Sequence, residues 1–293
     1  MGLTIETWNI AFRKRKSNLI FDNCDDFVLI KNDMYGWYAD PFLFDYNGET
    51  YLFAEYYSYK LKKGIIRYSK YNKNQECFDK FSTIIEESYH LSYPCVFKYK
   101  NNIYMMPESG ESGSLYFYKA EHFPDKWVKL SPLMTDVRLA DTTPIIKGDD
   151  LFALTLKQDV GNAANGSLCL LKFNNDSFDF VSEEPITSDM SLARPGGKCF
   201  VFNNKLYRVA QNCSEEYGKS ISLFAVEDDF ENHYSESLYC KVSADKVKLL
   251  NAGKPDGIHT YNFSEKLEVI DLKYYKKSYY RAFTALKEKI TNH

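Results

Sequence analysis

The sequence predicts an all-β protein, a five-bladed β-propeller with a short C-terminal α-helix. A repeat carries this prediction: Pro41, Pro94, Pro144 and Pro195 each open an apolar run, and they lie 53, 50 and 51 residues apart. This interval matches one four-stranded propeller blade, a unit that must stack on neighbours to bury its faces. A content of 24 tyrosines, and the lack of alternating strand and helix patterns before residue 272, also favour strands.

Each copy of the repeat predicts one blade. A second apolar run follows each proline, and small polar pairs such as Asn47-Gly48 and Asn203-Asn204 separate the two runs, as in tight hairpins. The copies begin at Asp40-Pro41, Tyr93-Pro94, Thr143-Pro144 and Arg194-Pro195, and a degenerate fifth copy covers residues 257–271. We therefore expect one domain over residues 1–271, with blades that start near residues 40, 93, 143, 194 and 257. Residues 1–35 are an entry segment and a candidate for the outer strand that closes the ring.

Residues 272–293 show a different period. Apolar residues at 272, 275, 279, 283, 286 and 290 have helical spacing, and Lys and Arg occupy the other faces. The pattern predicts a basic amphipathic helix with two open interpretations. The helix packs on the flank of the propeller, or it lies on an anionic membrane surface together with a second basic and aromatic patch of Trp8, Phe12 and residues 13–16.

Charge and cysteine content narrow the class of protein. A net charge of −3 argues against a nucleic-acid partner, which would favour a basic face. The seven cysteines form no C-x-x-C pair, so we expect them to be reduced and mostly buried. No stretch resembles a signal peptide or a transmembrane span, and no metal or cofactor motif occurs. We expect no metal, no cofactor and a cytoplasmic location, with the tail as a candidate contact to the inner face of the membrane.

Carboxylates at repeated positions are the candidate catalytic residues. The innermost strands of a propeller start at one rim, so residues just before each proline should converge on a common funnel. Asp40 precedes Pro41, which restricts it to extended geometry and can aim it into the channel. Glu108 lies among Met and aromatic residues, a surrounding that raises a carboxyl pKa and suits a general acid. Asp141 is a third carboxylate near a repeat proline, and Glu55 is the counterpart of Glu108 in the first repeat; structural pairing is the alternative for each.

The later repeats supply positive charge and further polar groups. Arg194, Lys198 and Arg208 could clamp a phosphate or a sugar carboxylate, or pair with the carboxylates of the rim. The other candidates for substrate binding are polar side chains expected near the same rim: His90, Tyr93, Thr142, Gln211, His259 and Asn262. A structural role is the alternative for each histidine.

Several segments resemble a known family. They are WYADPFLF, YLFAE, HLSYPCVF, IYMMPES, FPDKW, ADTTPII, ARPGGK, LYRVAQNCSEEYG and GIHTYN, which fall within residues 35–262. They resemble the glycosidase-like propeller of polysaccharide-biosynthesis loci and of the N-terminus of plant glucosamine inositolphosphorylceramide transferases. More distantly, they are similar to furanosidase-type glycoside hydrolases and mannoside phosphorylases. For the hydrolases, the resemblance implies an axial site with Asp40 as base or nucleophile, Glu108 as acid and Asp141 as the third carboxylate.

These observations favour a carbohydrate-active enzyme that transfers a glycosyl unit in the cytosolic assembly of a cell-surface glycan. Asp40 would act as base on the acceptor hydroxyl. The basic residues of the fourth repeat and His259 would hold the phosphates of a sugar-phosphate or nucleotide-sugar donor. Two alternatives remain open: a glycoside hydrolase that acts on oligosaccharides with Glu108 as acid, and a non-catalytic propeller that binds glycans.

Overall fold

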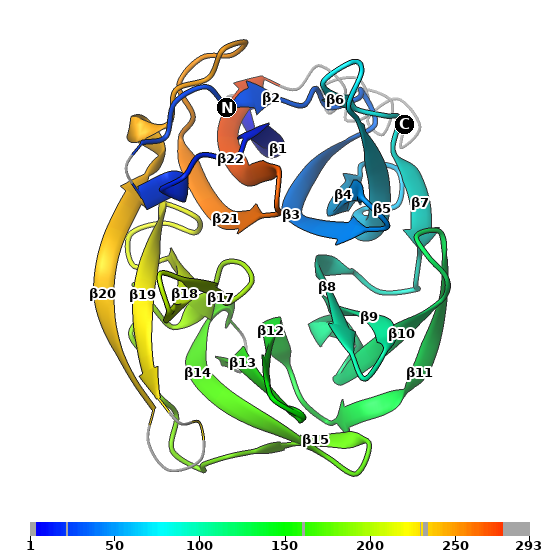
Figure 1. Ribbon diagram of the computed structural model, residues 1–293, viewed down its shortest axis with the longest axis vertical. Helices are drawn as coiled ribbons and strands as arrows, with labels where there is room; N and C mark the ends of the chain where they lie inside the picture. Colours follow the sequence, from blue (N-terminus) through cyan, green and yellow to red (C-terminus); the bar gives the residue numbers. More distant parts are fainter. Residues whose placement is uncertain (1–3, 22, 160–161, 229, 231–233, 278–293) are drawn as a thin grey trace, which may run out of the picture.

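The protein is a five-bladed β-propeller, as predicted. The computed structural model describes residues 4–21, 23–159, 162–228, 230 and 234–277. In this part of the chain, five antiparallel sheets stand around a central axis, each with one edge strand next to the axis (Figure 1). No helix among the described residues is long and apolar enough to cross a membrane.

Blades 1 to 4 follow one another along the chain. Blade 1 comprises β3 (Gly36–Tyr46), β4 (Glu49–Ser58) and β5 (Lys63–Asn72), with β6 (Cys77–Phe78) and β7 (Ser82–Ile85) on its outer edge. Blade 2 comprises β8 (Ser92–Tyr99), β9 (Asn102–Glu108), β10 (Ser114–His122) and β11 (Lys126–Thr135). Blade 3 comprises β12 (Leu139–Lys147), β13 (Asp150–Asp159), β14 (Asn162–Asn174) and β15 (Ser177–Phe180). Blade 4 comprises β16 (Arg194–Pro195), β17 (Phe200–Phe202), β18 (Lys205–Asn212), β19 (Ser220–Asp228) and β20 (Tyr234–Ser243).

Blade 5 joins the two ends of the chain and closes the ring. It comprises β21 (Gly257–Phe263), β22 (Leu267–Lys277), β1 (Thr4–Lys14) and β2 (Val28–Leu29), in order from the axis outward. β1 and β22 pair along their whole length, from Thr4 opposite Lys277 to Lys14 opposite Leu267. The entry segment therefore supplies the two outer strands of this blade.

The helix predicted from residue 272 is wrong for its first part. Residues 272–277 continue β22, where Leu272 pairs with Asn9 and Tyr275 with Glu6 of β1. Strand pairing overrides the helical spacing here, because β1 has no other partner for its backbone N–H and C=O groups along this edge. The remainder of the predicted helix, 278–293, lies outside the described residues.

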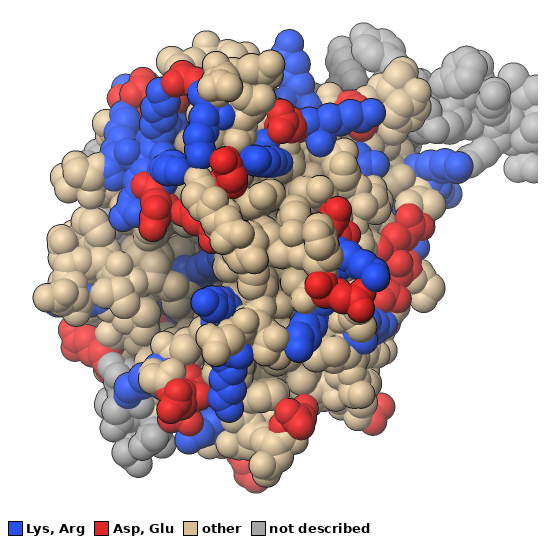
Figure 2. Space-filling model, turned by 45° about the vertical axis from the view of Figure 1, so that its right-hand side comes forward, with Lys and Arg blue, Asp and Glu red and all other residues tan. Residues whose placement is uncertain are grey.

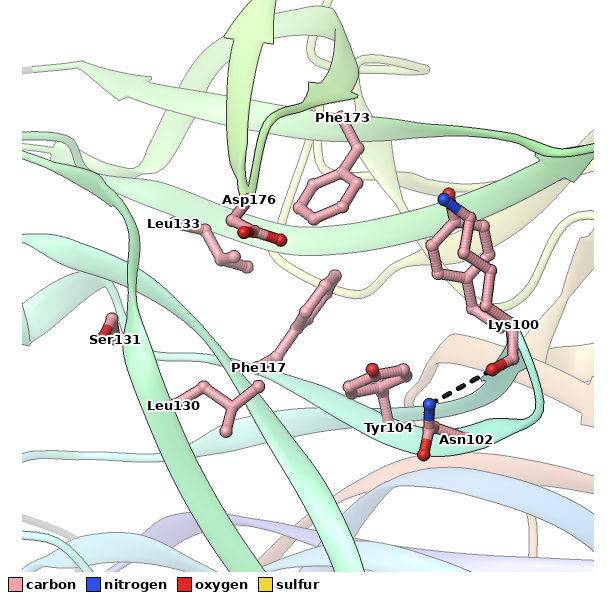
Figure 3. A pocket seen from close by; sticks show the side chains of 10 residues that line it. Lys100, Asn102, Tyr104, Phe117, Leu130, Ser131, Leu133, Phe173 and Asp176 are labelled. Atoms are coloured by element: carbon pink, nitrogen blue, oxygen red, sulfur yellow. Dashed lines mark hydrogen bonds between the residues drawn. The ribbon is translucent and has the colours of Figure 1, made fainter.

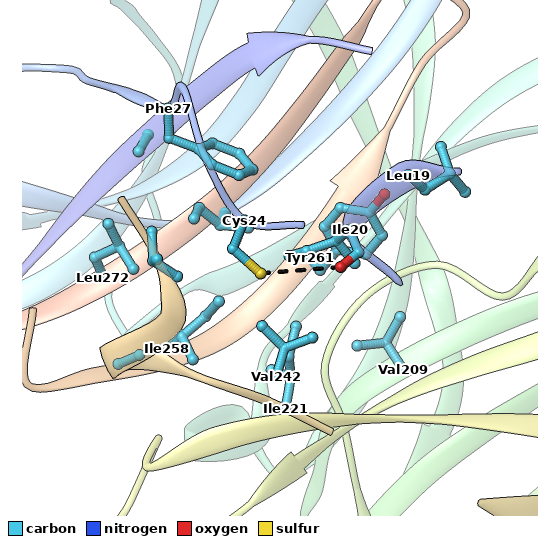
Figure 4. Packing of buried hydrophobic residues seen from close by; sticks show 14 of the residues in the cluster. Leu19, Ile20, Cys24, Phe27, Val209, Ile221, Val242, Ile258, Tyr261 and Leu272 are labelled. Atoms are coloured by element: carbon cyan, nitrogen blue, oxygen red, sulfur yellow. Dashed lines mark hydrogen bonds between the residues drawn. The ribbon is translucent and has the colours of Figure 1, made fainter. Parts of the chain in front are cut away.

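The core consists of five apolar clusters, one at each interface between neighbouring blades. Both faces of every blade are thus covered, which explains why the central strands read as continuous apolar runs. Figure 4 shows the cluster between blades 4 and 5, where Ile221 and Val242 face Ile258 and Leu272. Phe27, from the segment that links β1 to β2, closes this cluster from outside.

Trp8 and Phe12 belong to the interior, at 3% and 7% exposure. The prediction that they form an exposed basic and aromatic patch with residues 13–16 is therefore wrong, because only part of that segment meets solvent. Acidic and basic side chains are interspersed over the face of the molecule shown in Figure 2.

Turn residues support the predicted hairpins. Asn47 and Gly48 between β3 and β4 have φ angles of 50° and 77°, and Asn203 and Asn204 between β17 and β18 have 49° and 60°. Asparagine and glycine tolerate this left-handed conformation, which matches the twist of the flanking strands.

Candidate active site

Bulges in the innermost strands place the site. β3 is interrupted between Ala39 and Phe42, β8 between Ser92 and Cys95, and β12 between Ala140 and Thr143. The residues that open these bulges, Asp40, Tyr93 and Asp141, have φ angles of 48°, 47° and 50°. The expectation that Pro41 holds Asp40 in extended geometry is wrong, because the bulge turns its backbone into the left-handed region. Non-glycine residues rarely adopt that conformation, and it is frequent at functional sites.

The bulge also corrects the alignment of the third repeat. Asp141 and Thr142 occupy the place that Asp40 and Pro41 occupy in the first, so Thr143 and its proline do not mark the axial position. The axial side chain of blade 3 is therefore the carboxylate.

Asp40 is buried at the axis, with an exposure of 5%. Its Oδ1 accepts a hydrogen bond from Thr260 Oγ1 at 2.9 Å, and its Oδ2 accepts one from the backbone N–H of Tyr93 at 3.1 Å. Burial raises the pKa of Asp40 to about 6; His259 opposes this effect, and Asp141 and Asp271 add to it. The group changes charge close to neutral pH.

Asp271 fixes the orientation of His259. The Nδ1 atom of His259 lies 2.7 Å from Oδ2 of Asp271, and its Nε2 atom lies 3.9 Å from Oδ1 of Asp40. Burial alone would lower the pKa of His259, but the charges of Asp271 and Asp40 outweigh it and the pKa is raised. One face of the His259 ring stacks on Trp8, with 3.8 Å between the ring centres.

Asp40, His259 and Asp271 are close enough together to consider a metal ion, since one ligand atom from each lies within 4.8 Å of the others. The oxygens of Asp271, however, already accept backbone N–H groups of Asp40, His259 and Thr260 at 2.9, 3.2 and 2.9 Å. This donor pattern fits a carboxylate that organises the protein backbone better than a metal ligand.

Arg194 joins the other two predicted catalytic carboxylates. Its Nε atom lies 2.5 Å from Oδ2 of Asp141, and its Nη2 atom lies 3.3 Å from Oε2 of Glu108. Gln211 donates a further hydrogen bond to Oδ2 of Asp141 at 2.8 Å. Burial raises the pKa of Asp141 to about 7, with Arg194 opposing and Glu108 adding to the rise. The apolar surrounding predicted for Glu108 is wrong, because this side chain meets a guanidinium group.

Glu55 lies beside the same group of acids and is 4% exposed. Burial raises its pKa well above the usual range, and the charges of Asp40 and Glu108 add to the effect. Nε2 of His90 lies 3.3 Å from its Oε1 atom, but the contact lacks hydrogen-bond geometry. The structure thus brings Asp40, Glu55, Glu108 and Asp141 together, with Arg194, Gln211 and His259 around them.

Lys198 is not at this site. Its Nζ atom donates to the backbone oxygen of Leu43 at 2.9 Å, and the side chain lines a cavity of about 290 Å³ with Phe44, Phe97 and Ile146. Those residues follow the bulges by several positions, so the cavity is at the other end of the axis from the carboxylates.

Arg208 is also elsewhere. It is buried within blade 4, where its Nε atom lies 2.7 Å from Glu236 and its Nη1 atom donates to the backbone oxygen of Leu192 at 2.9 Å. The predicted phosphate clamp of Arg194, Lys198, Arg208 and His259 therefore does not form, and only Arg194 and His259 are near the carboxylates.

Tyr93 spans the axis under the carboxylates and is fully buried. Its hydroxyl group lies 2.8 Å from Oγ1 of Thr143 and accepts the backbone N–H of Gly197 at 2.7 Å. It thereby links blades 2, 3 and 4 and is a structural residue in this arrangement.

Asn262 and Thr142 have structural contacts as well. Asn262 donates to the backbone oxygen of Pro41 at 2.7 Å and accepts the backbone N–H of Lys198 at 2.8 Å, and Thr142 bonds Thr155 at 2.8 Å. The polar groups of both side chains are thus engaged in contacts within the protein.

Sequence reasoning missed Asp271 and Tyr217, and it assigned Trp8 to a surface patch. Thr260 and Tyr217 lie inside the matched segments GIHTYN and LYRVAQNCSEEYG, so those segments held the signal. The Tyr217 ring packs 5.1 Å from the guanidinium carbon of Arg194. Asp271 and Trp8 reach the site because β22 and β1 pair in blade 5, and a single sequence gives no signal for that pairing.

A separate groove lies away from the axis, between blades 2 and 3. It has a volume of about 470 Å³ and is lined by aromatic rings, among them Tyr104, Phe117 and Phe173, with Lys100 and Asp176 at its edge (Figure 3). None of the predicted site residues lines this groove.

Comparison with known proteins identifies the family of this chain. The family described as glucosamine inositolphosphorylceramide transferase 1, N-terminal, matches residues 24–267. The chain belongs to this family. Glucosamine inositolphosphorylceramide transferase 1 of Oryza sativa subsp. indica is 33% identical over 204 residues, which cover 68% of this chain and 27% of that protein. The relative in Arabidopsis thaliana is 34% identical over 204 residues, or 68% of this chain and 26% of its own length. This family member thus spans about a quarter of the curated relatives that it matches.

Solved structures similar to this family member include glycoside hydrolases. The catalytic domain of a GH62 α-L-arabinofuranosidase from Coprinopsis cinerea has a TM-score of 0.55 at 9% identity and covers 90% of this chain and 97% of its own. A GH32 β-fructofuranosidase from Bombyx mori has a TM-score of 0.56 at 13% identity and covers 79% of this chain and 53% of its own. At these identities the likeness shows the fold alone.

Proposed function

We propose that this protein acts on carbohydrate and transfers a glycosyl unit at the axial carboxylates during assembly of a cell-surface glycan. The convergence of Asp40, Glu55, Glu108 and Asp141 at one end of the axis carries the proposal. Arg194 contacts both Glu108 and Asp141, and the charges of Asp40, Glu108 and Asp141 raise the pKa of Glu55. Glycosyl transfer passes through an oxocarbenium-like state that carboxylates stabilise. The family's printed name, which belongs to much longer relatives, supports carbohydrate as the substrate class.

Asp40 acts as the base in this proposal. Its pKa of about 6 leaves it ionised at neutral pH, yet basic enough to take a proton from an acceptor hydroxyl. Glu108 is the acid that delivers a proton to the leaving group in this proposal, and Asp141, which Arg194 joins to Glu108, is the third carboxylate. Gln211 and His259 hold these groups in position.

A phosphate-activated donor is part of the proposal, with Arg194 as the cation for its phosphates. Lys198 and Arg208 do not contribute to this phosphate site, because Lys198 lines the cavity at the other end of the axis and Arg208 is buried within blade 4. We also propose a cytoplasmic location at or near the inner face of the membrane, which the basic tail favours.

Hydrolysis of a glycosidic bond is the second candidate. The missing phosphate clamp favours it, because a hydrolase needs two carboxylates and water and no cationic site for a leaving phosphate.

The test offers the purified chain nucleotide sugars with glycan acceptors, and aryl furanosides and pyranosides without them. We expect acceptor-dependent product, and a loss of about 100-fold or more in turnover with Asp40→Asn. Asp150→Asn, an exposed acid, is the matched control. Release of aryl alcohol that Glu108→Gln abolishes would establish the hydrolase, and glycan binding without any turnover would leave a non-catalytic propeller.

A further inference from the structure

One carboxylate oxygen in the described part of the chain is buried but lacks a hydrogen bond. Among the described residues, only Oε1 of Glu55 and Oγ of Ser222 are buried side-chain atoms without a partner. A buried acceptor without a donor is costly and rare in folded proteins, especially when it belongs to a carboxyl group. The nearest ring nitrogen, Nε2 of His90, lies 3.3 Å from this oxygen without hydrogen-bond geometry, so a donor on a ligand could complete it.

An aromatic pair continues the same surface toward the rim. On the adjacent strands β3 and β4, Trp37 pairs with Tyr57 and Ala39 pairs with Glu55. Side chains two residues apart on a strand share a face, so Trp37 and Tyr57 lie on the face of Glu55, about 7 Å further along the strands. Their rings are stacked, with 4.9 Å between centres and 9° between planes, and both side chains are half-buried.

His90 forms the opposite side of this surface. Its Nδ1 atom accepts the backbone N–H of Gly64 at 3.0 Å, which leaves the Nε2 atom, 3.3 Å from Glu55, as the protonated nitrogen in the neutral ring. Burial lowers the pKa of His90, so the neutral form is favoured. Its ring centre lies 6.4 Å from that of Tyr57, and its side chain is 29% exposed.

We propose that Glu55, His90 and the Trp37–Tyr57 pair form a subsite for one non-anionic sugar ring, whose hydroxyl groups donate to Glu55 and whose apolar face packs on the aromatic pair. A sugar ring offers both features, since its hydroxyls are donors and its C–H face is apolar. This inference rests on the proposed function for the class of ligand, but not for the chemistry performed on it.

The charges around the subsite define what it rejects. Four other carboxylates, Asp40, Asp141, Asp271 and Glu108, act on Glu55. Arg194, the nearby guanidinium, is shared by Asp141 and Glu108. A uronic acid ring would add another anion to this group, whereas a sugar ring without negative charge would not. The subsite therefore discriminates between a sugar and its uronate.

The test measures binding by the full chain with pairs of methyl glycosides that differ only at C6: glucoside and glucuronide, galactoside and galacturonide, mannoside and mannuronide. We expect at least one neutral glycoside to bind about tenfold or more tightly than its uronate. Glu55→Gln should weaken that binding and narrow the difference in affinity between the neutral glycoside and its uronate, because it keeps the shape of the side chain and removes one acid from the group. Trp37→Ala should weaken it about tenfold, and Trp37→Phe much less.

Tyr239→Ala is the control, because this half-exposed ring lies on β20 at the outer edge of blade 4. Equal or tighter binding of uronates, no binding of any neutral glycoside, or unchanged binding in Glu55→Gln and Trp37→Ala would each overturn the subsite. Turnover that persists while these two variants bind normally would reject the subsite and leave the proposed function standing. Loss of binding in both variants, in a chain without turnover, would support the subsite alone.

Discussion

The imidazole ring of His259 lies flat against the indole ring of Trp8, with 13° between their planes. The two residues come from β21 and β1, near opposite ends of the chain. Their rings meet across β22, which lies between these two strands in blade 5. The side chain that faces Asp40 therefore depends on the strand that closes the ring.

Trp8→Ala should reduce the free energy of unfolding by about 3–5 kcal/mol, because it removes a large buried ring from a closed interface. Trp8→Phe keeps an aromatic surface behind His259 and should cost less. Urea unfolding followed by circular dichroism measures both. A loss of less than about 1 kcal/mol in Trp8→Ala would show that ring closure does not depend on this contact.

The contribution of Asp40 to stability should fall as pH rises, the opposite of a carboxylate whose pKa is lowered by folding. Its pKa of about 6 in the folded protein exceeds the ordinary value of 3.8, so the folded state binds this proton more tightly. The contribution therefore falls as pH rises from about 4 to about 6, by on the order of 3 kcal/mol at 1.36 kcal/mol per pKa unit. Asp40→Asn should gain stability relative to the wild type across this window. A difference between the two that is flat with pH would contradict the assignment.

Tyr93→Phe should cost about 1–3 kcal/mol of stability, because the buried N–H of Gly197 loses its acceptor. Turnover per folded molecule should stay close to that of the wild type, since the hydroxyl group bonds only Thr143 and Gly197. Tyr99→Phe is a milder control, because its hydroxyl group bonds a turn residue, Asp149, at the edge of blade 3. A specific loss of turnover with Tyr93→Phe would return this residue to the substrate-binding group.

Arg194 and Lys198 should separate in function. Arg194→Lys keeps the charge but loses the planar fork that reaches Asp141 and Glu108, and turnover should fall about tenfold or more. Lys198→Met should leave turnover within about twofold of the wild type, because Lys198 lines the cavity at the other end of the axis. Initial rates of both variants decide this, and equal losses would mean that the two cations share one site.

The repeat allowed much of the fold to be predicted, because blade length and hairpin chemistry are local properties. Proline spacing located four of the five blades, and pairs such as Asn47-Gly48 located their hairpins. The alignment at Thr143 was wrong because a bulge of two residues has no periodic signal. The helix predicted from residue 272 was wrong for residues 272–277, because helical spacing does not reveal that the edge of β1 is available for pairing.

At the site, the acids and Arg194 could be predicted, but Lys198 and Arg208 lie elsewhere. Asp40 and Asp141 occupy matching points on the innermost strands, and Glu55 and Glu108 occupy matching points on the next strands, so their convergence follows from the ring. Arg208 lies three residues before Gln211 on β18 and therefore points to the opposite face of that strand, toward Glu236. A cationic side chain points to one face of its strand or to the other, depending on its odd or even position. Whether it reaches the axis also depends on acidic partners that are distant in sequence.

The pairing of β1 with β22 has a consequence for how the molecule is made. β1 is synthesised long before its partner β22, and at ordinary elongation speeds the delay is on the order of tens of seconds. Contacts so remote along the chain also make folding slow. During that interval the apolar faces of blades 4 and 1 lack blade 5 as their neighbour. The nascent chain is therefore a candidate client for chaperones until β22 pairs with β1.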